Sequence, residues 1–295
     1  MEKINFYIVD VFAEEKYAGN QLAVFVNAGS LPDPQMQKIA REMNYSETTF
    51  VISPELRSGG YDVRIFTPQQ EIPFGGHPTL GTAYIIRQEL LKGKAEEIKL
   101  NLLVGQIPVQ VVREPGKPDI FWMRQNPPTF GEKLTIEAIA PILHLDPQEI
   151  DPRFPIQEVS TGFPFIIVPL LGLKALQQAR IDREKLLALV ANTEAKAVLI
   201  FCPETRHPAN QLSVRVFVDY FGIPEDPATG SANGCLAGYL AQYAYFGKDE
   251  IDLRVEQGYE INRPALLLLK AHKNGTEIQV LVGGQVVLVA KGELC

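Results

Sequence analysis

The sequence predicts an α+β protein made of two similar halves, and three observations support this. Short strands with alternating apolar residues outnumber helices. Strands and helices do not alternate regularly, which argues against a doubly wound parallel sheet. Two short segments also recur in the same order. Thr48–Glu55 resembles Ala197–Glu204 at a spacing of 149, and Arg64 in Val-Arg-Ile-Phe resembles Arg215 in Val-Arg-Val-Phe at a spacing of 151.

The composition is that of an ordinary globular protein. The 295 residues are 46% hydrophobic and 21% charged, enough to bury a core in two domains. The formal net charge of −7 and the lack of a basic stripe exclude nucleic acid as the main partner. Three cysteines without metal-ligand spacing favour a reducing compartment over a disulfide framework. The first residues lack a signal-peptide layout and no long apolar run is present, so we expect a cytoplasmic protein without a membrane partner.

Periodicity predicts the elements in order. Helices are expected at Asp33–Met43, Pro78–Leu91, Ile136–Leu143 and Asp182–Val190. Strands are expected at Asn5–Phe12, Gln21–Asn27, Thr48–Ser53, Tyr61–Phe66, Glu97–Leu103, Gln106–Arg113, Asp119–Met123, Phe163–Leu170, Ala197–Glu204 and within Glu277–Leu294.

The boundary between the halves is expected at Gln125–Gly131, which is rich in turn residues. The tail is expected to dock back onto one of the halves. The predicted domains are therefore residues 1–124 with about 278–295, and residues 125–277.

The chain is organised around two stretches of the same design, Val63–Ile86 and Val214–Leu240. Each begins with an alternating strand, passes an Ile-Pro step into a glycine-rich turn, and enters a small-residue segment typical of a buried helix. Two helix N-termini of this kind suit the binding of one anion. Domain clefts are common ligand sites, so we expect the halves to meet at one.

In the first stretch, Gly75-Gly76-His77-Pro78-Thr79 opens the helix. Pro78 suits the first helical position, and the amide of Gly76 or His77 is placed to bind a carboxylate. The His77 side chain is a candidate for proton transfer. A purely structural role for His77, capping the helix, is an equally good interpretation.

In the second stretch, Glu225-Asp226-Pro227-Ala228-Thr229-Gly230-Ser231 opens the helix. Asp226 and Ser231 are both good helix caps, and this role explains at least one of them. In the functional interpretation, Asp226 orients a polar group of the substrate while Ser231 and the amide of Gly230 bind an oxyanion.

Glu47 lies where a turn enters the strand from Thr48. Most loop glutamates are solvated, but a carboxylate at a strand entrance beside a cleft is suited to general acid/base catalysis. The other histidines, His144, His207 and His272, are interpreted as surface residues. Cys235 falls in an apolar segment and is interpreted as a core residue.

At these positions the chain resembles the phenazine-biosynthesis PhzF-like family of the diaminopimelate epimerase superfamily. The motifs Pro73–Gly81 (PFGGHPTLG) and Glu225–Ala232 (EDPATGSA) carry the resemblance. Further matches lie along nearly the whole chain, at Asp10-Val11-Phe12, Gly19-Asn20, Tyr45–Thr48, Phe66-Thr67-Pro68, Glu71, Gln257-Gly258, Arg263-Pro264 and Val282-Gly283-Gly284.

The resemblance implies two pseudo-symmetric domains, each a curled, mostly antiparallel sheet around a central helix, with the active site between them. It implies an isomerase that needs no cofactor and no metal and acts on a small carboxylate-bearing molecule. In the characterised family isomerase, a glutamate matching Glu47 moves a proton on a dihydro-hydroxyanthranilate ring. His77, Asp226 and Ser231 match its helpers, while Gly76 and Gly230 match carboxylate-binding amides. The family also suggests a homodimer.

Two departures and two alternatives accompany the resemblance. Gly75 and Thr229 stand where the superfamily's epimerases have cysteines, so a two-thiol mechanism is not expected. Gln21 stands where the family often has proline, which affects the geometry of that loop. An amino-acid epimerase with a carboxylate base, or a non-catalytic binding protein with the same fold, are the other interpretations.

Overall fold

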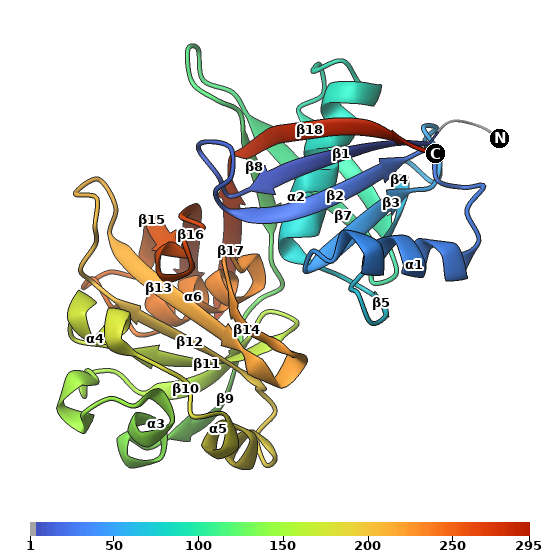
Figure 1. The fold of residues 1–295 in the computed structure, drawn as a ribbon. Helices are drawn as coiled ribbons and strands as arrows, with labels where there is room; N and C mark the ends of the chain where they lie inside the picture. The colour runs from blue at the N-terminus through green and yellow to red at the C-terminus, as the bar shows by residue number, and fades with distance from the viewer. Residues whose placement is uncertain (1–3) are drawn as a thin grey trace. The chain divides into compact units, whose positions relative to one another are not determined.

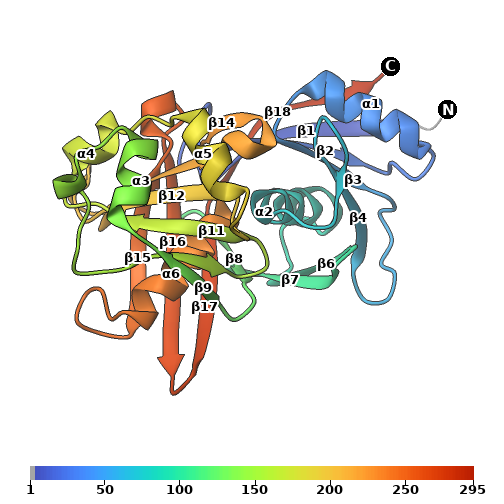
Figure 2. The same cartoon turned by 90° about the horizontal axis from the view of Figure 1, so that it is seen from below.

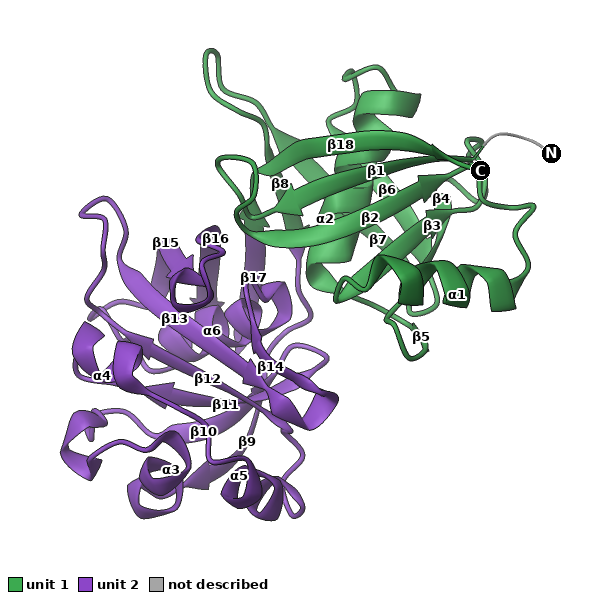
Figure 3. Ribbon diagram, in the orientation of Figure 1, with its two compact units in different colours: residues 1–123, 283–295 green, residues 124–282 purple. Residues whose placement is uncertain are grey.

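The structure is a computed structural model that describes residues 4–295. It divides into two compact units, coloured separately in Figure 3. Unit 1 consists of the chain up to Met123 together with Gly283–Cys295, and unit 2 is Arg124–Val282. Within residues 4–295, none of the helices combines the length and the apolar character needed to cross a membrane.

Unit 1 is a mixed sheet in which neighbouring strands follow the order β18-β1-β2-β3-β4-β6-β7-β8, with the short β5 also paired to β4. The β2–β3 and β4–β6 pairs are parallel and the other pairs are antiparallel. The strands are β1 (Ile4–Val11), β2 (Asn20–Val26), β3 (Glu47–Val51), β4 (Tyr61–Phe66), β5 (Glu71–Ile72), β6 (Glu97–Leu102), β7 (Gly105–Val112), β8 (Ile120–Arg124) and β18 (Val286–Leu294).

Helix α2 (Gly76–Ile85) is the core of unit 1, and Figure 2 looks nearly along it, with the strands curling round it. Every residue of α2 except Tyr84 is buried, as expected of a helix with no polar face. The predicted helix continues past Ile85 as one π-helical turn, η1 (Ile86–Leu90). Gly81 allows α2 to pack closely on the sheet, because a Cβ at this position would lie 2.6 Å from Leu22 Cδ2.

Helix α1 (Asp33–Met43) covers the outer face of the unit 1 sheet, with the bounds that the sequence predicts (Figure 1). Met36 and Ala40 of α1 belong to a buried cluster with Phe25, Phe50 and other residues of the sheet. The alternation of the strands therefore supports two apolar layers, one toward α2 and one toward α1.

Unit 2 repeats this plan around α6 (Gly230–Gln242), in which nearly every residue is buried. Its strand order is β9-β10-β11-β12-β13-β15-β16, with β14 also paired to β13. The strands are β9 (Thr129–Leu134), β10 (Ile156–Ser160), β11 (Pro164–Pro169), β12 (Ala197–Cys202), β13 (Leu212–Val218), β14 (Ile223–Asp226), β15 (Glu250–Gln257), β16 (Ala265–Asn274) and β17 (Glu277–Gly284).

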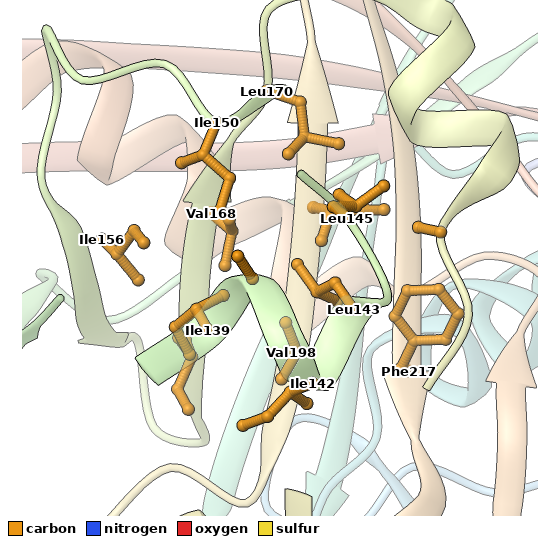
Figure 4. Packing of buried hydrophobic residues seen from close by; sticks show 14 of the residues in the cluster. Ile139, Ile142, Leu143, Leu145, Ile150, Ile156, Val168, Leu170, Val198 and Phe217 are labelled. Atoms are coloured by element: carbon orange, nitrogen blue, oxygen red, sulfur yellow. The ribbon is translucent and has the colours of Figure 1, made fainter. Parts of the chain in front are cut away.

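Three helices cover the outer face of the unit 2 sheet: α3 (Ile136–Leu143), α4 (Leu173–Gln178) and α5 (Arg183–Val190). Figure 4 shows the cluster beneath them, in which α3 residues such as Ile139 and Leu143 pack on Val168 and Val198 of the strands. Short 3₁₀ turns lie at Pro147–Glu149, Asp219–Phe221 and Tyr259–Ile261.

The two units share one topology, which confirms the predicted duplication. In each unit, a parallel strand pair (β2–β3, β11–β12) is followed by an antiparallel pair (β3–β4, β12–β13). The last of these strands then pairs in parallel with the strand that follows the central helix (β4–β6, β13–β15). The ladders also correct the register of the predicted repeat. Thr48 pairs with Phe66 and Val198 with Phe217, so Thr48 corresponds to Val198, a spacing of 150 rather than 149.

The two Ile-Pro steps are not equivalent. Ile72 pairs with Ile65, whereas Ile223 pairs with Val218 at the other end of its hairpin. The position equivalent to Ile72 is Asp226, which pairs with Val216. The three-residue turn Asp219–Phe221 occurs only in the second hairpin and accounts for the displacement.

Candidate active-site residues

Glu47 is the first residue of β3 rather than part of the preceding turn. The hydroxyls of Thr49, two residues further on, and Thr82 of α2 lie 2.8 Å apart, so this face of β3 is directed at the central helix. Glu47 lies on the same face because side chains alternate along a strand. Its side chain is 19% exposed, and Oε2 of its carboxylate is buried.

His77 is the second residue of α2, and its Nε2 lies 3.3 Å from Glu47 Oε2. The atoms are in close contact, but their geometry does not make a hydrogen bond. The imidazole is buried, and this desolvation lowers the pKa of His77 to about 3, although a hydrogen bond to the backbone of Gln21 acts in the opposite direction. His77 is therefore neutral at physiological pH.

The hydrogen bond to Gln21 also decides the tautomer of His77. Because Nε2 has no hydrogen bond, the nitrogen that donates to the Gln21 backbone is Nδ1. Nε2 is then an unprotonated acceptor facing the Glu47 carboxyl group. The pair is suited to holding one proton and passing it to a third group.

The start of α2 differs from the sequence-based expectation in two details. Gly75 is the N-cap and has no side chain to accept from the first amides, so the amides of Gly76 and His77 are available at the helix end. Pro78 is the third helical residue, not the first, which is tolerated because amides of the first turn lack helical partners. The imidazole bonds a neighbouring strand and does not cap the helix.

In unit 2, the turn before α6 holds Asp226 and Thr229. Asp226 ends β14 and is 8% exposed. The N-cap is Thr229, but its hydroxyl donates to Asp226 Oδ2 instead of accepting from the helix amides. The expected capping roles of Asp226 and Ser231 are therefore wrong: Asp226 precedes the cap, and Ser231 is the second helical residue, partly exposed beside the amide of Gly230.

The other histidines and Cys235 lie where the sequence predicts. His144, His207 and His272 are exposed, as predicted. Cys235 is buried in α6, as predicted, and burial raises the pKa of its thiol to about 12. Gln21, the departure from the family pattern, lies next to Leu22, which packs on α2.

The Gln21 side chain is therefore on the opposite face of β2, the face on which Ala23 packs beneath α1. Having glutamine here, where the family often has proline, changes the outer surface of the strand. The backbone of Gln21 still accepts the hydrogen bond from His77.

The structure thus places Glu47 beside His77 in unit 1, and Asp226 beside Thr229 and the start of α6 in unit 2. Reasoning from sequence misses two residues that shape the turn before α6, Thr229 and Gln257. In the sequence, Thr229 stands out only as the replacement of an epimerase cysteine, and Gln257 only as part of a family motif. The signal that could have identified Gln257 is a polar residue directly before a glycine, at the buried end of a strand.

Comparison with known proteins identifies the family of the chain. The model of the phenazine biosynthesis-like protein family (PhzC-PhzF) matches residues 9–292. The chain belongs to this family. It is 35% identical to the trans-2,3-dihydro-3-hydroxyanthranilate isomerase of Pseudomonas fluorescens over 98% of this chain and 99% of that protein. It is 32% identical to an uncharacterised isomerase of Mesorhizobium japonicum over 100% and 99% of the two chains.

The crystal structure of a PhzF-family protein of Bacillus anthracis matches the whole chain with a TM-score of 0.91 and 28% identity, and is itself covered completely. The family fold, a curled sheet around a central helix, is the fold found in each unit. PhzF-like proteins include isomerases, and this chain is an isomerase of the family.

Proposed function

We propose that this PhzF-like protein moves a proton between two carbons of a small carboxylate-bearing molecule, with Glu47 as the general acid/base. The contact between Glu47 and neutral His77 at the start of α2 carries the proposal. A mostly buried carboxylate with an accepting imidazole beside it is suited to taking up a proton and returning it. Unit 2 has no carboxylate at the equivalent position, because by strand register Glu47 corresponds to the buried Ala197.

The reaction needs no external electron carrier. The Glu47 carboxylate removes a proton from one carbon, and the electrons of the broken C–H bond shift into the adjoining unsaturated system. The carboxyl group then returns the proton to a different carbon, so the product is an isomer of the substrate. His77 Nε2 faces the carboxyl group and stays neutral, so the proton in transit remains on Glu47 between the steps.

The amides of Gly76 and Gly230, at the starts of the two central helices, are each assigned to binding an anionic group such as a carboxylate. Both helices begin with an N-cap that does not use its side chain on these amides. A helix N-terminus of this type stabilises an anion through its free amides and its dipole. In this proposal Ser231 binds the anionic group together with the amide of Gly230, and Asp226 orients a polar group of the substrate.

The test uses trans-2,3-dihydro-3-hydroxyanthranilate, the compound named for the Pseudomonas relatives. In deuterated water, the wild-type protein should isomerise it and incorporate deuterium at carbon. Glu47→Gln should abolish incorporation while calorimetry shows nearly unchanged binding. Glu89→Gln, which alters a glutamate bonded to Tyr7 away from this pair, is the matched control and should behave as wild type.

Deuterium incorporation at the wild-type rate in Glu47→Gln would refute the role of Glu47. If the wild-type protein is inactive on this compound, a panel of amino acids and cyclic carboxylates is assayed for proton exchange with the same two variants. Inversion at a single carbon without migration of a double bond would identify an epimerase and contradict the proposed shift.

A further inference from the structure

Gln257 is a fully enclosed side chain directly beneath the turn that precedes α6. It ends strand β15 and is 1% exposed. Its amide makes four hydrogen bonds. Nε2 donates to the Asp226 carbonyl at 2.8 Å and to Thr229 Oγ1 at 3.1 Å. Oε1 accepts from the Thr229 amide at 3.2 Å and from Asn233 Nδ2 at 2.8 Å.

These bonds use the complete capacity of the amide nitrogen and both lone pairs of its oxygen. They join the first and last residues of the four-residue turn from Asp226 to Thr229, and they tie that turn to the first turn of α6 through Asn233. One side chain therefore fixes the path of the backbone that presents the Asp226 carboxylate and the amide of Gly230.

The same contacts set the direction in which the Thr229 hydroxyl group donates its hydrogen. Thr229 Oγ1 accepts from Gln257 Nε2, so its own hydrogen is left to donate to Asp226 Oδ2. The order is Gln257 N–H, Thr229 O–H, Asp226 carboxylate, and each bond polarises the next. Gln257 thereby supports the hydrogen bond from Thr229 to the Asp226 carboxylate without contacting that carboxylate.

The fold itself does not require an amide at this position. In unit 1 the equivalent strand is β6, where Leu100 pairs with Tyr61 as Val255 pairs with Leu212. Two residues further along, the position of Gln257 is occupied by the buried Leu102. Unit 1 builds the same strand, turn and helix with this leucine, and its turn carries Ile72 and Gly75 where unit 2 has Asp226 and Thr229.

The next residue shows how closely the two segments approach. Gly258 has a φ of +80°, and a Cβ there would lie 2.3 Å from the Arg263 carbonyl oxygen and 2.6 Å from the Pro227 carbonyl oxygen. Only glycine fits against the turn in this conformation. Gln257 and Gly258 therefore both lie against the turn, the first through hydrogen bonds and the second through close backbone contact.

We infer that Gln257 is a positioning residue, which sets the geometry of the Asp226–Thr229 turn and the orientation of the Asp226 carboxylate for the proposed reaction. The inference rests on the proposed function for its effect on catalysis. Its effect on the turn is independent of any substrate.

The experiment compares wild type, Gln257→Leu and Gln257→Glu with Gln157→Leu as matched control. Gln157 is also buried in unit 2, and it bonds the Gly131 carbonyl and the Tyr243 hydroxyl away from the turn. Amide hydrogen exchange measured by mass spectrometry on the peptide that covers residues 226–233 is the primary readout. Thermal unfolding gives global stability. The constants kcat and KM are measured with trans-2,3-dihydro-3-hydroxyanthranilate, or with the active compound of the panel described above.

Gln257→Leu should raise exchange in this peptide at least tenfold, whereas Gln157→Leu should not change it. We expect a fall of about 100-fold in kcat/KM, the loss that a misplacement of about 1 Å causes, mainly in kcat. Exchange and kcat both equal to wild type in Gln257→Leu would overturn the inference. If exchange rises equally in Gln257→Leu and in Gln157→Leu, the cause is general destabilisation, and this result would overturn the inference as well.

Gln257→Glu separates positioning from packing, because its volume is unchanged. When protonated, the carboxyl group can donate to the Asp226 carbonyl and accept from Thr229 and Asn233. When ionised, it cannot donate and faces the Asp226 carbonyl oxygen. Exchange of the peptide, normalised to the intrinsic rate, should therefore approach wild type at pH 5 and exceed it at pH 8. A ratio that stays constant across the measured ionisation of this carboxyl group would contradict the inference.

If Gln257→Leu does not fold, Thr229→Val with Thr229→Ser as rescue tests the same chain of hydrogen bonds. Only serine keeps the hydroxyl that reaches Asp226. Loss of kcat in both variants would contradict the proton order. If the wild-type protein has no activity on any compound, the proposed function fails while the exchange measurements still decide the role of Gln257.

Discussion

Arg215 holds Glu225 in a two-pronged ion pair, in which Nε lies 3.0 Å from Oε1 and Nη2 lies 2.7 Å from Oε2. Unit 1 contains the same arrangement between Arg64 and Glu71, with both distances 2.7 Å. Each glutamate precedes the position that leads into a glycine turn. The pairs therefore tie the strand before the turn to its neighbour in both units.

The two pairs differ in burial, and this difference predicts their effect on stability. Arg215 and Glu225 are 5% and 8% exposed, against 24% and 25% for Arg64 and Glu71. Arg215→Met should lower the free energy of unfolding by about 3–5 kcal/mol, because it leaves a buried carboxylate uncompensated. Arg64→Met should cost less, because water can solvate Glu71. Urea denaturation of both variants measures the difference.

The double variant Arg215→Met/Glu225→Gln provides the control for that comparison. It should recover part of the lost stability, because the buried charge has been removed with its partner. Equal losses in Arg215→Met and Arg64→Met would show that burial does not determine the strength of these pairs.

The buried His77 makes stability depend on pH. Burial lowers the pKa of His77 from 6.5 to about 3. Between these values the unfolded chain binds a proton at this residue that the folded chain does not. The free energy of unfolding should therefore decrease as the pH falls from about 6.5 towards 3. His77→Asn should make this decrease shallower, measured by urea unfolding at pH 7, 6, 5 and 4.

His144→Asn is the control for the pH experiment, since His144 is exposed and its removal should not change the slope. The same slope in His77→Asn as in wild type would show that the imidazole is protonated in the folded state.

Gly81 in α2 provides a test of close packing in unit 1. Alanine is intrinsically better than glycine in a helix by about 1 kcal/mol. A Cβ at this position would, however, lie 2.6 Å from Leu22 Cδ2 and 2.8 Å from Val11 Cγ2. We expect overpacking to dominate, so that Gly81→Ala destabilises the protein by about 1–3 kcal/mol in chemical denaturation. A stabilised variant would contradict the packing.

The three cysteines should differ sharply in reactivity. Burial raises the pKa of Cys202 to about 11 and that of Cys235 to about 12, while Cys295 is exposed. Because the thiolate is the reactive form, an aromatic disulfide reagent should modify one thiol quickly in the native protein and all three after denaturation. Rapid modification of Cys235, identified by peptide mass analysis, would contradict the burial of α6.

The sequence by itself determined the duplication, most element positions and the two glycine turns. Helices α1 and α3 have the predicted bounds, because each presents a regular apolar face and a clear end signal. The family motifs also identified the candidate residues Glu47, His77, Asp226 and Ser231. These features are local, so short segments of the chain encode them.

Only the tertiary structure decided how these residues are used. The contact of Glu47 with His77 joins β3 to α2, and the tautomer of His77 depends on a carbonyl of β2, so neither follows from local sequence. The register of the repeat had to come from the ladders, since a shift of one residue exchanges the faces of a strand. The role inferred for Gln257 depends on β15 returning beneath a turn about thirty residues earlier, a contact between distant segments that no sequence spacing predicts.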